Sequence, residues 1–186
     1  MFHRMLPPYR FLLIAAAISV PTLAYGQLSV LTYGAKCNWN GSSGTDDTTA
    51  FLGAAKAANT LYNATEAVVS VQLPAGQACV VDGLVTVGSG VHFVGPGTII
   101  VQNQSGATLQ FQDADNVGVE NLMIDVKSGP GGNNAALAVL GWTDTASDAS
   151  IHSNVDFRGN TVIDGSWGIF VTYASGSGSL QNVDIF

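Results

Sequence analysis

The chain has 186 residues, of which 47% are apolar, 10% are charged, 22 are glycine and two are cysteine. The charged fraction is less than half of the usual ~25%, and Lys and Glu are scarce, which disfavours a helical bundle or a coiled coil. The mean hydropathy of +0.29 argues against disorder. A β-rich, turn-rich chain remains, long enough for one domain with a sizeable core.

Residues 1–26 have the pattern of a signal peptide. Two arginines precede the ten apolar residues Phe11–Val20, and small residues follow at the cleavage positions. Ten apolar residues are too few to cross a bilayer, which needs ~20 in a helix. We expect cleavage between Gly26 and Gln27, with a cut after Ala24 as the alternative. A buried N-terminal helix is the competing interpretation.

Cleavage of the signal peptide removes two of the six cations and leaves the mature chain with a net charge of −9. Nucleic-acid binding depends on clustered Lys and Arg, so we exclude that partner. An acidic polysaccharide would be repelled unless Ca²⁺ bridged the two negative partners. The predicted location is secreted or periplasmic, with no membrane association after signal cleavage. Such a compartment is oxidising and favours a Cys37–Cys79 disulfide; two separate small core residues are the alternative.

The first segments of the mature chain combine one strand with one helix. Leu28–Tyr33 alternates and is predicted to be a strand, and Gly34–Gly44 is predicted to be a loop. Helical spacing predicts a helix over Thr48–Ala58 with one apolar face, consisting of Phe51, Leu52, Ala55 and Ala58. Asp46-Asp47 is interpreted as the cap of this helix, because its first N–H groups need acceptors. An acid/base or metal role for the pair is the alternative.

From Ala67 onward, short apolar strands alternate with Gly, Asn, Asp and Ser turns. The predicted strands are Val68–Leu73, Cys79–Val81, Leu84–Val87, Val91–Val94, Thr98–Val101, Thr108–Phe111, Val117–Val119, Leu122–Ile124, Ala136–Leu140, Val155–Phe157, Thr161–Ile163, Gly168–Val171 and Leu180–Phe186. A sandwich, a propeller or a solenoid would fit this pattern.

An internal repeat favours the solenoid. The core Asn-x-x-Ile-Asp occurs at Asn121 and again at Asn160, each time followed by a glycine-bearing loop and an apolar strand. We expect the two asparagines to lie at the same bend of different coils, where an amide bonds the backbone and tolerates left-handed geometry. The strands also carry consecutive apolar residues instead of strict hairpin alternation, which favours parallel stacking.

Three ordered segments, Leu31–Lys36 (LTYGAK), Gly44–Phe51 (GTDDTTAF) and Leu73–Gly76 (LPAG), resemble the N-terminal signature of the pectate-lyase-like superfamily, in its rhamnogalacturonase/epimerase-like branch. The resemblance extends over about residues 28–186 of this chain. It implies an all-β fold, a right-handed single-stranded parallel β-helix with an N-terminal capping helix over residues 27–66 and coils over 67–186. Cys37 replaces the glycine of the family pattern, and no aromatic follows Gly76; both departures adjoin a cysteine, which supports the disulfide.

The resemblance also implies a secreted, carbohydrate-active protein, and polygalacturonase-type relatives carry acid and base carboxylates on successive coils. The matching places fall near 133–135 and 166–167, where those carboxylates are absent. A Ca²⁺-dependent lyase would instead need clustered carboxylates and a base. Asp125 and Asp164 are the candidate residues, with Lys127 and Arg158 as nearby bases; turn and surface carboxylates are the alternative. No resident cofactor is expected.

Two tryptophans are candidates for sugar contact. An exposed indole can stack against a sugar ring, and a neighbouring carboxylate can accept hydroxyl hydrogen bonds. Trp142 and Asp144 are placed at the start of a polar loop over residues 141–154, and Trp167 lies in a later loop; core filling is the alternative. His92 and His152 are interpreted as structural or surface residues, without a metal site.

The sequence ends within a predicted strand, and a stacked solenoid needs a polar cap, so we expect further C-terminal coils beyond residue 186. The expected function is recognition of a polysaccharide, with cleavage of its glycosidic bonds by hydrolysis or β-elimination. A non-catalytic, adhesin-like surface protein is the alternative. The oligomeric state is left open.

Overall fold

The structure, a computed structural model, describes residues 26–102, 108–127, 140–144, 151–164, 169–173 and 179–185. Within these residues the chain is mostly β, with one α-helix, α1 (Thr48–Thr65), and one 3₁₀ turn, η1 (Val30–Tyr33). The strands are β1 (Gln27–Ser29), β2 (Val69–Gln72), β3 (Ala78–Val80), β4 (Val85–Val87), β5 (Val91–Val101), β6 (Leu109–Gln112), β7 (Val117–Val126), β8 (Leu140–Asp144), β9 (Ile151–Arg158), β10 (Thr161–Ile163), β11 (Ile169–Tyr173) and β12 (Ser179–Ile185).

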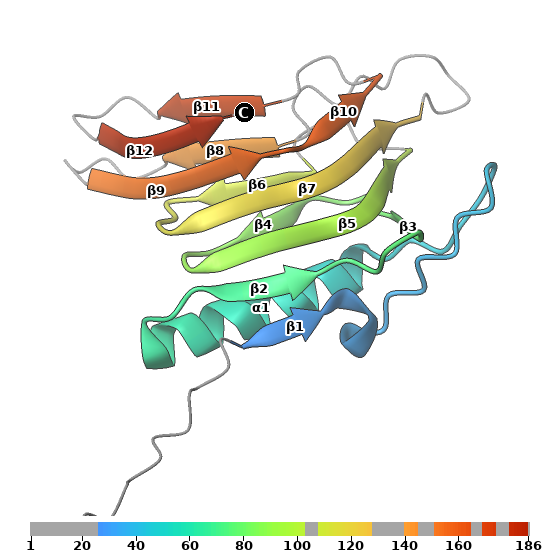
Figure 1. Cartoon of the computed structure of the whole chain (residues 1–186), viewed down its shortest axis with the longest axis horizontal. Coiled ribbons are helices and arrows are strands. Elements are labelled where there is room, and N and C mark those ends of the chain that lie inside the picture. Colours follow the sequence, from blue (N-terminus) through green and yellow to red (C-terminus); the bar gives the residue numbers. More distant parts are fainter. Residues whose placement is uncertain are drawn as a thin grey trace, which may run out of the picture.

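The strands form two parallel sheets. The first has the order β1-β2-β5-β7-β9-β12, with β3 on β5 and β10 on β7, and the second has the order β11-β8-β6-β4. Figure 1 shows β2, β5, β7 and β9 one above another, with β4, β6, β8 and β11 behind them. Every strand pairing in the described residues is parallel, so the chain moves between the sheets instead of reversing in hairpins. Two facing layers of antiparallel hairpins are therefore excluded for these strands.

The predicted strands are largely confirmed within the described residues, with three corrections; the strand predicted over 136–140 lies outside these residues except for its last position. The segment Leu28–Tyr33 is not one strand, because it leaves the sheet after Ser29 and closes as η1. The separate strands predicted over 91–94 and 98–101 join as β5, and those over 117–119 and 122–124 join as β7. The breaks that the sequence predicts between these strands are bends within one continuous strand. Pairing between β5 and β7 is present on both sides of each bend.

The bend in β7 explains the two asparagines of the sequence repeat. Asn121 has a left-handed φ of 56°, and so does Gly159 at 63°, which the register places beside it. The Asn160 amide donates to the Val119 carbonyl (2.6 Å) and accepts from the Leu122 N–H (3.1 Å). The Asn160 amide therefore bonds the backbone, as predicted, but the prediction that Asn121 and Asn160 share one bend position is wrong, because Asn160 lies one position beyond the equivalent of Asn121.

The core lies between the two sheets and is closed at one end by α1, which lies beneath β2 in Figure 1. The rings of Phe51 and Phe93 stack with centroids 5.8 Å apart, which joins the helix to the first coils. The buried face of α1 consists of Ala50, Phe51, Ala54, Ala55 and Ala58. Leu52, predicted on that face, is 38% exposed, and the helix continues seven residues beyond the predicted Ala58. A face of alanines lets the helix approach the sheet closely, so the bulkier Leu52 lies at its edge.

The start of α1 uses the two aspartates differently. Asp46 accepts hydrogen bonds from the Thr48 amide (3.0 Å) and hydroxyl (2.5 Å) and from the Asp82 amide (3.2 Å). Asp47 occupies the cap position but makes no side-chain cap bond. Burial raises the pKa of Asp46, but these hydrogen bonds outweigh burial and leave the pKa below its ordinary value. The capping prediction is therefore confirmed for Asp46 and wrong for Asp47.

Removing the Phe51 ring should open a cavity at the end of the core. We expect Phe51→Ala to lower the free energy of unfolding by about 3–5 kcal/mol in urea denaturation. Leu52→Ala is the matched control on the same helix and should cost much less, because Leu52 is already partly in water. Equal losses in the two variants would contradict the placement of Phe51 in the core.

Asp46 should contribute stability that depends on pH. A carboxylate whose folded pKa is depressed stabilises the fold above its unfolded pKa of about 3.9, and this contribution is lost as the pH falls through the folded value. Asp46→Asn should therefore be less stable than the parent near neutral pH, and the difference should vanish well below about pH 3.9. Asp164→Asn is the control, because Asp164 is exposed; a pH-independent loss in Asp46→Asn would contradict the charge effect.

Candidate functional site

Charged side chains gather on the outer face of the first sheet. His92, Gly118, Asp156 and Asp184 occupy one register position in β5, β7, β9 and β12. Neighbouring strands lie about 4.8 Å apart, so these positions form a row across the strands. The sequence neighbours of His92, Gly118 and Asp156 are buried in the core, which directs these three residues outward, and Asp184 pairs with Asp156 at the same position. We call this surface, together with Glu120 and Arg158, the polar face.

Four of these side chains, those of His92, Glu120, Arg158 and Asp156, form a continuous series of contacts beside Gly118, which we call the charged ring. His92 Nδ1 lies 3.3 Å from Glu120 Oε1, and Arg158 lies 4.0 Å from the same carboxylate oxygen. Arg158 Nε donates to both oxygens of Asp156, at 2.5 and 2.7 Å, and its Nη2 also binds Asp156. Each member therefore has its orientation fixed by another, which is typical of a preorganised binding surface.

Three carboxylates, those of Glu120, Asp156 and Asp184, and one permanent cation, Arg158, lie in or beside the charged ring. The hydrogen bonds from Arg158 to Asp156 raise the pKa of the arginine, and the charges of Asp156, Glu120 and Asp184 raise it further, against the opposing effect of desolvation. The three carboxylates and the one guanidinium together carry two net negative charges. An anionic ligand would be repelled here.

A groove of about 280 Å³ crosses this face. It is lined by Val68, His92, Asn116, Asn154, Val155, Asp156, Asn182 and Asp184. The three asparagines stand in equivalent places on successive coils, each with left-handed φ. They donate in sequence: Asn182 to Asn154 (3.1 Å), Asn154 to Asn116 (2.7 Å) and Asn116 to the Tyr62 hydroxyl (2.8 Å). We call these three residues the asparagine ladder. It gives the groove a fixed polar wall of amides, which can both donate and accept hydrogen bonds.

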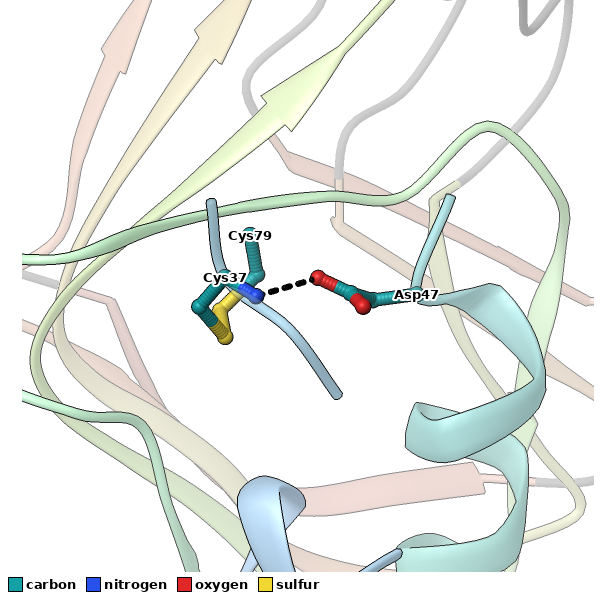
Figure 2. A group of neighbouring side chains, drawn as sticks. All are labelled: Cys37, Asp47 and Cys79. Atoms are coloured by element: carbon teal, nitrogen blue, oxygen red, sulfur yellow. Dashed lines mark hydrogen bonds between the residues drawn. A yellow bond between two sulfur atoms is a disulfide. The ribbon is translucent and has the colours of Figure 1, made fainter. Parts of the chain in front are cut away.

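A second cluster joins Cys37, Asp47 and Cys79, and all three are buried (Figure 2). The predicted disulfide is present between Cys37 and Cys79, so their sulfurs are bonded to each other and are not metal ligands in this state. The Asp47 carboxylate accepts hydrogen bonds from the backbone N–H groups of Lys36 (2.7 Å) and Cys37 (2.9 Å). The cluster therefore fastens the first loop to the sheet, a structural role that accounts for this buried charge.

The disulfide should stabilise the chain mainly by restricting the unfolded state. Its cysteines are 42 residues apart, and the chain-entropy relation then gives a loss of about 4 kcal/mol for the double variant Cys37→Ala/Cys79→Ala. Urea denaturation measures this loss, and mass spectrometry after alkylation checks the bond. We expect no label without reductant and two labels after reduction; two labels without reductant would contradict the disulfide.

The candidate carboxylates Asp125 and Asp164 do not share a register position. β10 pairs with β7 so that Ile163 lies beside Asp125, and Asp164 follows in a left-handed turn with φ 60°. Asp125 forms an ion pair with Lys127 (2.5 Å). The repeat seen in the sequence is displaced by one residue from the structural register, so the two aspartates are not matched positions of two coils.

The predicted sugar-contact residues lie partly outside the described residues. Trp142 and Asp144 are in β8, where Trp142 pairs with Phe111 and Val171. The predicted loop over 141–154 is therefore wrong in its first part, and it is also wrong in its last part, because residues 151–154 belong to β9. The polar composition of this segment is typical of a loop and did not predict the strand β8. Trp167 and most of the predicted signal peptide fall outside the described residues; Gly26 is exposed and Gln27 begins β1.

Sequence reasoning did not identify the polar face. His92 was interpreted as a structural or surface residue, and Glu120 and Asp156 were not predicted to be functional residues. The available signal was alternation for His92 and Asp156, because each stands between two core residues of its strand, whereas Glu120 is followed by the exposed Asn121. His152, expected in a polar loop, is instead buried in β9 at 3.4 Å from Asp115.

No protein-family model, curated protein or solved structure matches this chain. Among the described residues, no helix combines the length and the apolar character needed to cross a membrane.

Proposed function

We propose that this chain is part of an exported right-handed parallel β-helix, of the pectate-lyase-like type, that binds a polysaccharide on its polar face. The observation that carries the proposal is the groove across β5, β9 and β12, with preorganised polar side chains on successive parallel strands. The stacked parallel register and the helix at the end of the core support the solenoid, and the disulfide supports export.

A polysaccharide suits this groove because its hydroxyl groups both donate and accept hydrogen bonds. The asparagine ladder and the carboxylates offer both kinds of partner along one wall. A nucleic acid would bring phosphates toward a face with two net negative charges, and the chain has few cations to offset them. Binding across several coils would also explain why the polar residues recur on separate strands.

Cleavage of the bound glycan is a second candidate function. His92 beside Glu120 is a histidine–carboxylate pair, an arrangement that can take up and return a proton. Hydrolysis would produce new reducing ends, whereas β-elimination would produce unsaturated ends that absorb ultraviolet light. Either product, lost in His92→Gln and retained in Thr86→Ala, would favour an enzyme over a binding protein.

Binding can be measured by affinity electrophoresis of the full-length chain through gels that contain xylan, glucomannan, galactomannan or polygalacturonate. We expect at least one neutral polysaccharide to retard the chain. In Asp156→Asn, we expect the binding affinity to fall by roughly tenfold, or 1.4 kcal/mol, because Arg158 loses its ionic partner and the charged ring loses its arrangement. Thr86→Ala, an exposed position on β4 of the other sheet, is the matched control.

Polygalacturonate should bind weakly in the absence of Ca²⁺, because the polar face is anionic. Retardation by no polysaccharide would refute the proposed function. Equal retardation of the parent and Asp156→Asn would move the binding site away from the polar face.

A further inference from the structure

We propose that Asn40 is an acceptor for an N-linked glycan, and that the fold favours this residue over a second acceptor sequence at Asn63. The inference concerns a sugar that the chain carries, not one that it binds. It rests on the export that forms part of the proposed function, and it does not depend on the polar face.

The acceptor sequences can be read directly from the chain. An N-linked glycan is attached to asparagine in the sequence Asn-x-Ser/Thr, where x is not proline. This sequence occurs at Asn40 (Asn-Gly-Ser), Asn63 (Asn-Ala-Thr) and Asn103 (Asn-Gln-Ser). Asn103 lies outside the described residues. Asn40 and Asn63 are both exposed, so the geometry around each of them, not its accessibility, distinguishes the two.

Asn40 lies in the loop between η1 and α1, the light-blue trace that projects from the sheets at the right of Figure 1. Residues 40–46 are all exposed. The base of this loop is closed by the Asn38 side chain, which accepts from the Thr45 N–H (2.9 Å) and donates to the Thr45 hydroxyl (3.1 Å). The loop is therefore open to a large modifying enzyme and is still fastened at its base.

A tight turn surrounds the Asn40 amide. Its Oδ1 accepts from the Ser42 N–H (3.0 Å), the Ser42 hydroxyl (3.0 Å) and the Ser43 N–H (2.9 Å). Gly41 permits this arrangement, because its left-handed φ of 99° folds the chain back on the asparagine. The amide nitrogen Nδ2 has two protons and donates one of them to the Ser43 hydroxyl (3.4 Å). The second proton is the one that glycan attachment would replace.

This turn suits the chemistry of glycan transfer. Nδ2 attacks the anomeric carbon of a sugar that is held on a lipid diphosphate. The new C–N bond forms, the C–O bond to the diphosphate breaks with its electron pair going to the diphosphate, and one Nδ2 proton passes to a base of the transferase. As this proton leaves, negative charge develops on the Asn40 Oδ1. The three donors on that oxygen stabilise this charge, as in an oxyanion hole.

Asn63 lacks this arrangement because it lies in the last turn of α1. Residues two apart on a helix do not face each other, so the Thr65 hydroxyl is directed away from the Asn63 amide. It donates instead to the Leu61 carbonyl (2.8 Å), and the Asn63 Nδ2 donates to Asn59 Oδ1 (3.3 Å). We therefore expect Asn63 to be a poor acceptor while α1 is folded.

The test uses the folded, disulfide-bonded full-length chain, purified from a host that attaches no N-linked glycans. It is incubated with a eukaryotic oligosaccharyltransferase and an oligosaccharide on dolichyl diphosphate. Peptide mass spectrometry locates each mass increase that peptide N-glycosidase then removes. We expect Asn40 to be modified at least roughly tenfold faster than Asn63, because only Asn40 has the hydroxyl on its amide.

Three variants separate the turn from the acceptor sequence. Gly41→Ala keeps the sequence but strains the left-handed turn, so modification of Asn40 should slow by roughly tenfold. Ser42→Thr keeps the hydroxyl and should preserve modification. Ser43→Ala, the matched control beside it, keeps the backbone donor to Oδ1 and should also preserve modification. Slow modification of Asn63 in each variant, together with an unchanged circular dichroism spectrum, shows that α1 is still folded.

Three results would overturn the inference: no modification of Asn40, equal rates at Asn40 and Asn63, or a folded Gly41→Ala that is modified at the parental rate. None of them bears on the proposed binding of a polysaccharide, because gel retardation is measured on the unmodified chain from the same host. If that chain is retarded by no polysaccharide, the proposed binding fails while the rates at Asn40 and Asn63 still decide this inference.

Discussion

The parallel register between successive strands is the constraint on which the rest of this structure depends. It places like positions of distant segments side by side, so that His92, Gly118, Asp156 and Asp184 form one row although unequal lengths of chain separate them. The same register stacks Val117 on Val155 inside the sheet. A single geometric rule therefore produces both an apolar interior and a continuous polar exterior.

The bends show how this register is kept where the strands change direction. Asn121 and Gly159 adopt left-handed φ at the same level, and the Asn160 amide bonds the backbone on both sides of Asn121. The asparagine ladder joins successive coils by bonds between side chains, just before β7 and within β9 and β12. Side-chain amides thus replace backbone pairing at the places where the sheet cannot supply it.

The sequence was sufficient for the local structure because strands and the helix are encoded by short patterns. Short apolar runs between turn residues predicted most of the described strands, and the oxidising compartment expected after export favoured the Cys37–Cys79 disulfide. The errors came from long-range geometry. The motif shared by Asn121 and Asn160 is displaced by one residue from the true register, which separates Asp125 from Asp164. The charged ring joins three strands, and no local pattern announces contacts of that kind.

The two buried or half-buried carboxylate clusters show why only one of them suits a ligand. Asp47 lies beside the disulfide, where two backbone N–H groups satisfy it and no opening remains. Asp156 is nearly as buried, but its partner is the exposed guanidinium of Arg158, and its other neighbour in the row is a glycine. Both carboxylates are held in place, yet only Asp156 is held beside an open groove. The proposed recognition therefore depends on a carboxylate that is held in place and still lines an open groove, and of these two carboxylates only Asp156 meets both conditions.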